Sequence, residues 1–102
     1  MGRYDALVQQ QKDALTAPGG ETAVALRRAL LEGRMSEAPA SIGAYVDKVR
    51  RHAWQVTDED VDALKRTGFT EDQIFEVTCS TAVGAALVRM ERALTVLREA
   101  GA

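Results

Sequence analysis

The residues of this 102-residue chain best suited to nucleophilic chemistry are its single cysteine, Cys79, and its single histidine, His52. Glu76 would stand one helical turn before Cys79 and could act as an acid or a base. A reactive thiol needs a lowered pKa and some exposure. On a helical wheel, however, Cys79 falls on an apolar side of its helix. The pattern predicts a small core residue at Cys79 and an edge position for His52.

The sequence lacks the residues that other kinds of site require. One cysteine excludes an internal disulfide, a CxxC redox pair and a zinc site built from several thiolates. The acidic run Asp58–Asp60 lacks the alternating spacing and central glycine of a calcium loop. Gly19 and Gly20 belong to no phosphate-binding motif. We therefore expect no metal and no cofactor.

Charge and hydropathy narrow the range of partners. The formal net charge is −2, and the closest basic groupings are pairs such as Arg50 and Arg51. Such pairs do not make a nucleic-acid footprint. The first residues contain no apolar signal-peptide core, and no apolar run approaches the roughly 20 residues that cross a bilayer. The expectation is a cytoplasmic protein with no nucleic-acid partner and no membrane attachment.

Apolar periodicity and chain breaks predict five helices. They cover about residues 3–16, 21–34, 40–55, a short segment between Thr57 and Gly68, and 71–98. The apolar stripe of the first begins at Tyr4, and Arg27 falls inside the apolar arc of the second. A buried guanidinium would be costly unless it is paired, so we expect the aliphatic stem of Arg27 to extend to the edge of the core. The sequence thus predicts one all-α domain over residues 1–102, a small antiparallel bundle ending in a long buried helix.

The starts of the last two helices carry the strongest local signals. Thr57 with Asp60, and Thr70 with Gln73, have the spacing of capping boxes. Apolar residues flank each box in the positions of a hydrophobic staple, Val56 with Val61 and Phe69 with Ile74. Gly68 stands where a glycine would end the short helix.

The first half of the last helix is apolar around most of its circumference, which predicts burial on several sides. Small residues there would let another helix approach closely, and Trp54 lies off the apolar stripe of its own helix. Contiguous uncovered apolar surface usually marks an interface. The candidate interface residues are Trp54, Phe75, Thr81, Gly84, Ala85 and Val88.

The pattern VTDEDV from Val56, TEDQIFE from Thr70 and AVGA from Ala82, with the preceding stretch from Tyr45 to Trp54, spans about residues 45–97. It resembles the carboxymuconolactone decarboxylase / alkylhydroperoxidase D-like superfamily. The resemblance implies an all-helical, alkylhydroperoxidase D-like fold that assembles into dimers, trimers or hexamers through helix packing. Peroxidatic members carry a CxxC pair and a later histidine. Laid on Cys79, those positions hold Ala82 and Ala86, so the implied scaffold lacks its redox motif.

The sequence therefore supports two main functional hypotheses. The first is a non-catalytic family member that self-associates, or docks on a protein partner, through its C-terminal helix. The alternative is a degenerate peroxidase- or decarboxylase-type enzyme that uses Cys79 as a lone redox thiol, with Glu76 nearby. A small apolar ligand bound between subunits is a third reading.

Overall fold

Five α-helices make up most of the computed structural model, which describes residues 2–101 and the side chains of residues 5–101. They are α1 (Gly2–Leu15), α2 (Val24–Leu31), α3 (Ala40–His52), α4 (Asp58–Arg66) and α5 (Glu71–Gly101), with short 3-10 turns at Met35–Glu37 and Ala53–Gln55. Within residues 2–101 there is no strand. The all-helical prediction and the number of helices are confirmed. The expected role of the Tyr4 side chain lies outside the described residues.

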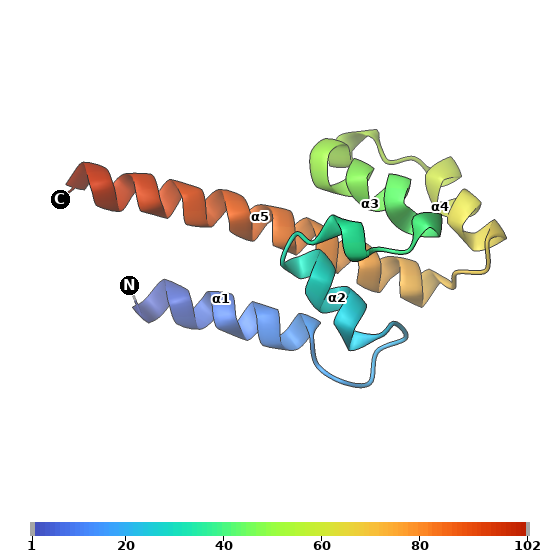
Figure 1. Ribbon diagram of the computed structural model, residues 1–102, viewed down its shortest axis with the longest axis horizontal. Helices are drawn as coiled ribbons and strands as arrows, with labels where there is room; N and C mark the ends of the chain where they lie inside the picture. The colour runs from blue at the N-terminus through green and yellow to red at the C-terminus, as the bar shows by residue number, and fades with distance from the viewer. Residues whose placement is uncertain (1, 102) are drawn as a thin grey trace.

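The core occupies one end of the molecule, where α2, α3 and α4 pack against the first half of α5 (Figure 1). Its buried apolar cluster consists of Leu30, Ile42, Tyr45, Val46, Val49, Leu64, Ile74 and Val77. The last buried residue of α5 is Leu87. The remainder of α5 extends beyond the core with only α1 beside it, and the two chain ends lie on the same side (Figure 1). This extension accounts for the elongated shape of 52 × 30 × 21 Å.

Both predicted capping boxes are formed. Thr57 Oγ1 accepts a hydrogen bond from the Asp60 N–H, and Asp60 returns one from the Thr57 N–H at 2.9 Å. At the start of α5, Thr70 Oγ1 accepts from the Gln73 N–H at 3.1 Å, and Gln73 Oε1 accepts from the Thr70 N–H at 2.9 Å. Because each box satisfies two otherwise free N–H groups, the starts of α4 and α5 are fixed locally.

The end of α4 is fixed in the same local way. Gly68 has a φ of +104°, in the left-handed region that glycine adopts without strain. The Phe69 N–H bonds the Leu64 carbonyl and the Gly68 N–H bonds the Lys65 carbonyl. These two bonds make a Schellman motif, which ends the helix and turns the chain toward α5.

Three helices differ from their predicted lengths: α2 and α3 are shorter, with α2 ending at Leu31 instead of Arg34, and α5 runs to Gly101 instead of Arg98. α2 begins at Val24 instead of Glu21, because Ala23 has an extended backbone and the N–H groups of Glu21 and Thr22 bond the Glu76 carboxylate. α3 ends at His52, whose φ of −142° breaks the helix before a 3-10 turn that contains Trp54. The late start of α2 and the early end of α3 arise from interactions or backbone angles that apolar periodicity does not encode.

Candidate functional site

Two of the three candidate catalytic residues, Glu76 and Cys79, line one pocket. It has a volume of about 310 Å³ and lies between the end of α1, the α1–α2 loop and α5. Leu15, Gly20 and Arg27 line the opposite side. The helical spacing of Glu76 and Cys79 therefore brings them to the same cavity, as their positions one turn apart predict.

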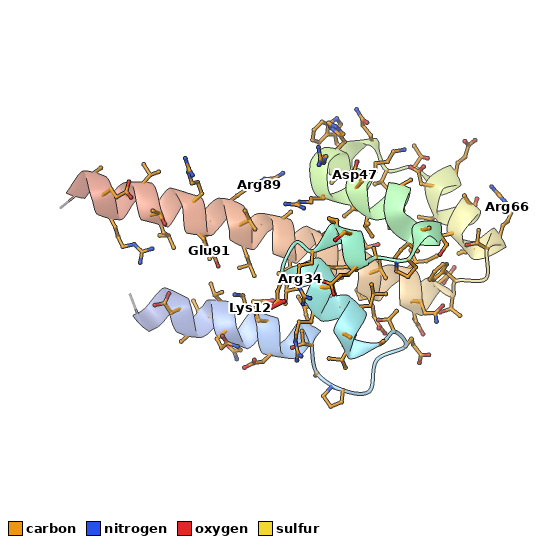
Figure 2. All side chains as sticks on the ribbon, viewed as in Figure 1. Lys12, Arg34, Asp47, Arg66, Arg89 and Glu91 are labelled. Atoms are coloured by element: carbon orange, nitrogen blue, oxygen red, sulfur yellow. The ribbon has the colours of Figure 1, made fainter. Side chains whose placement is uncertain are left out.

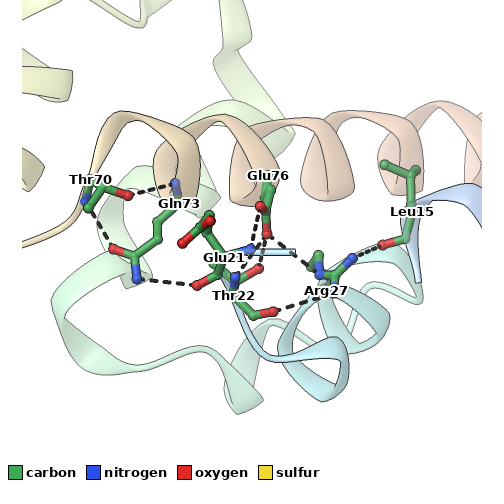
Figure 3. Close-up of polar contacts among 7 residues, drawn as sticks. All are labelled: Leu15, Glu21, Thr22, Arg27, Thr70, Gln73 and Glu76. Atoms are coloured by element: carbon green, nitrogen blue, oxygen red, sulfur yellow. Dashed lines mark hydrogen bonds and ion pairs between the residues drawn. The ribbon is translucent and has the colours of Figure 1, made fainter. Parts of the chain in front are cut away.

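The carboxylate of Glu76 is fully engaged in holding the α1–α2 loop (Figure 3). Its Oε1 accepts from the Thr22 N–H at 2.9 Å and from Thr22 Oγ1 at 2.6 Å, and its Oε2 accepts from the Glu21 N–H at 2.7 Å. Burial opposes the charged form, but these hydrogen bonds and the nearby Arg27 outweigh it and hold the pKa of Glu76 below its usual value. Glu76 is thus an ionised structural acceptor and a poor general base.

Arg27 is the cation that this carboxylate faces. Its Nε lies 3.7 Å from Glu76 Oε1, and its side chain is only 6% exposed. Nη1 donates to the Leu15 carbonyl at 3.0 Å and Nη2 to the Thr22 carbonyl at 3.4 Å (Figure 3). The prediction that the Arg27 side chain extends to the edge of the core is wrong, because the side chain is buried. The buried guanidinium instead joins the end of α1, the loop and α5.

Cys79 is partly exposed at the pocket, so the expectation of a core cysteine is not met. Desolvation by the surrounding side chains raises the pKa of its thiol above the usual value. The nucleophilic form is the thiolate. Cys79 is therefore accessible from the pocket, while its raised pKa disfavours the thiolate form.

We expect a disulfide reagent to label Cys79 in the native protein, completely but slowly. At pH 8 the rate should be below that of a free model thiol, because the raised pKa lowers the thiolate fraction. The rate should keep rising as the pH is raised above 9. Labelling as fast as the model thiol at neutral pH would contradict this account of the site.

His52 belongs to a different part of the surface. It is exposed at the end of α3, and its ring meets Trp54 edge to face, with centroids 5.3 Å apart at 88°. Among the described residues, His52 does not line the Cys79 pocket. The structure therefore does not assemble Cys79 and His52 into one site.

The six candidate interface residues divide into two groups. Thr81 and Gly84 are buried inside the chain, and Gly84 lies directly against the carbonyl groups of Leu30 and Leu31 at the end of α2. The close helix approach predicted at Gly84 is therefore made by α2 of the same chain, and neither residue can face a partner in this conformation. Trp54, Phe75 and Val88 are exposed, and Ala85 is partly exposed.

Sequence reasoning missed an apolar surface on the part of the molecule that we call the arm, α1 together with residues 88–101 of α5. No side chain of residues 5–15 or 88–101 is buried, yet Leu7, Val96 and Leu97 are all more than half exposed. The two helices of the arm meet through Lys12 and Glu91, which face each other in Figure 2. The apolar spacing of Leu87, Met90, Leu94 and Leu97 signals only part of this surface, because Leu97 alone among these four residues is exposed.

Across the residues that the structure describes, no three His, Cys, Asp or Glu side chains gather as metal ligands would, and no helix is long and apolar enough to cross a membrane. Comparison of the chain with protein-family models, with curated proteins and with solved structures gives no match.

Proposed function

We propose that this protein is a non-catalytic, self-associating helical protein of the carboxymuconolactone decarboxylase-like type, which pairs with a second copy of itself through its arm. The observation that carries the proposal is the exposure of the apolar side chains of Leu7, Val96 and Leu97 on two helical segments, residues 5–15 and 88–101, in which no side chain is buried. The family part rests on the residue pattern over 45–97, whose two capping boxes both form.

The arm needs a further packing partner for its own stability. Isolated helices of about 12–15 residues are marginal in water, and most helix stability comes from burying an apolar face. α1 is 14 residues long, and the end of α5 past Leu87 is of similar length. Burying the exposed apolar side chains of these two helical segments would contribute about 25 cal/mol per Å² of apolar area.

A second copy of this chain is the partner that best fits the exposed apolar side chains of the arm. α1 and the end of α5 run antiparallel, with both chain ends at the tip of the arm (Figure 1). Two such pairs related by a twofold axis form a four-helix bundle, in which the same apolar residues come from both subunits. The polar side chains of the arm are of both signs, such as Lys12 and Glu91, so like charges do not oppose the contact.

A non-catalytic role is supported by the state of the candidate catalytic groups. Glu76 already accepts three hydrogen bonds from the loop, and the pKa of Cys79 is raised by burial. The enzyme alternative needs the opposite, a lowered thiol pKa beside a free base.

Light scattering of the wild-type protein at micromolar concentration should give a mass of about 22 kDa, twice the 11.0 kDa of one chain. Replacing Val96 and Leu97 with glutamate should return the mass to one chain, because buried like charges would face each other across the twofold axis. Phe75→Glu is the control, since Phe75 is about as exposed as Leu97 but lies outside the arm. A monomeric wild type, or a dimer lost through Phe75→Glu and kept in the arm variant, would refute the proposal.

A further inference from the structure

Three arginines border a hollow where the end of α3 meets the middle of α5. Arg50, Arg51 and Arg89 line both of two pockets, with volumes of about 400 and 200 Å³. Because the pockets share these arginines and Ala85, they form one continuous cleft. In Figure 2, Arg89 projects from α5 on the side opposite to Glu91, away from the arm contact.

Within residues 5–101, the positive charge of this cleft is neutralised only in part. Only Arg51 has an ionic partner, Asp47 at 2.9 Å on its own helix. Arg50 and Arg89 bond carbonyl groups instead: Arg50 Nη1 donates to the Gly33 carbonyl, and Arg89 Nη2 donates to the Arg50 carbonyl, both at 3.4 Å. These contacts position the two guanidinium groups and leave most of their five N–H donors free.

The remainder of the cleft is apolar and includes an aromatic ring. Ala82, Ala85 and Val88 of α5 contribute small side chains, and Trp54 borders one end. The indole is 77% exposed and is held edge-on to His52. An exposed, oriented indole beside guanidinium groups offers a planar ligand both a stacking surface and a counter-charge.

We propose that this cleft binds a small planar organic anion. Its carboxylate or phosphate group would be held by Arg50 and Arg89, and its ring would lie against Trp54 and the alanines of α5. Two features favour a small ligand over a nucleic acid. The cationic surface consists of a few arginines in a chain of net charge −2, whereas nucleic-acid sites present extended basic tracks. The cleft is also concave and of small-molecule size.

Trp54 is the single tryptophan of the chain, so its fluorescence reports directly on this cleft. Titration with phenyl phosphate at low ionic strength should give a saturable change that weakens as salt is added. Benzoate should bind similarly if the site recognises an anionic head group in general. Inorganic phosphate and phenol should each bind more weakly, because inorganic phosphate lacks the aromatic ring and phenol lacks the anionic group.

The double variant Arg50→Gln/Arg89→Gln should weaken phenyl phosphate binding about tenfold or more, because charge-assisted pairs are the strong contacts here. Arg92→Gln is the matched control, since Arg92 is an exposed arginine of α5 that does not line the cleft. Circular dichroism checks that both variants fold, and calorimetry with Trp54→Phe should show weaker but charge-dependent binding. The proposal is overturned by the absence of saturable binding, by equal effects of both arginine variants, or by tighter binding of a single-stranded oligonucleotide.

Discussion

Glu76→Gln should lower the free energy of unfolding by about 3 kcal/mol, the low end of the cost of breaking a buried ion pair, because Arg27 is buried and Glu76 is partly exposed. Two effects combine. The buried guanidinium of Arg27 loses the carboxylate that faces it at 3.7 Å. In addition, both oxygens of Glu76 accept hydrogen bonds from donors of Glu21 and Thr22. Because an amide replaces one oxygen with an NH₂ group, the variant must oppose donor to donor on one side.

Urea unfolding at a fixed protein concentration, followed by circular dichroism, measures this loss. Glu32→Gln is the matched control, because Glu32 pairs with Arg34 at a half-exposed site and such pairs contribute less than about 1 kcal/mol. Arg27→Met combined with Glu76→Gln should cost less than the sum of the two single changes, since neither unpaired group then remains. Equal losses for Glu76→Gln and Glu32→Gln would contradict the assigned role.

The same interaction makes stability depend on pH. Since folding lowers the pKa of Glu76, the unfolded chain takes up a proton first as the pH falls. The contribution of Glu76 is therefore complete above its ordinary value of 4.5 and is lost as the pH falls toward the lower folded value. Wild type should lose more stability than Glu76→Gln between neutral pH and pH 3.5, and Asp60 and Glu71, whose pKa values are also lowered, contribute equally to both.

Features encoded within a few residues were predictable from the sequence. The caps at Thr57 and Thr70 and the glycine stop at Gly68 involve partners three to five positions apart. The residue types alone therefore determine where α4 and α5 begin. The length of α2 was not predictable in this way, because the Glu76 carboxylate that draws Glu21 and Thr22 out of the helix comes from a distant element.

The candidate site was predictable only as a list of residues. Helical spacing placed Glu76 one turn from Cys79, and in the structure both residues line the same pocket. It could not show that the carboxylate is occupied by the loop or that Arg27 is its buried counterion. Arg50 and Arg89 are far apart in sequence, so their joint cleft follows only from the packing of α3 on α5. The exposed apolar residues of the arm were missed because the periodicity of an apolar stripe does not show whether other helices of the same chain pack against that stripe.

Gly84→Ala should destabilise the protein, although alanine has a higher helix propensity than glycine. In the middle of a helix alanine is favoured over glycine by about 1 kcal/mol. Here, however, the added Cβ would lie 2.5 Å from the Leu31 carbonyl oxygen and 2.8 Å from that of Leu30. These are backbone atoms of α2, so relief requires the two helices to move apart. Overpacking of this kind costs about 1–3 kcal/mol and sometimes more, and we expect a net loss of about 2 kcal/mol.

Gly43→Ala provides the matched control with the opposite expected sign. Gly43 lies inside α3, and a Cβ added there would meet nothing within 4 Å. The propensity gain then acts alone and should raise the unfolding free energy by about 0.5–1 kcal/mol. The same urea titration compares the two variants. If Gly84→Ala were stabilising to the same extent, α2 could not lie against α5 as closely as the Leu31 carbonyl indicates. The opposite signs would show that glycine at position 84 is required by the contact between helices.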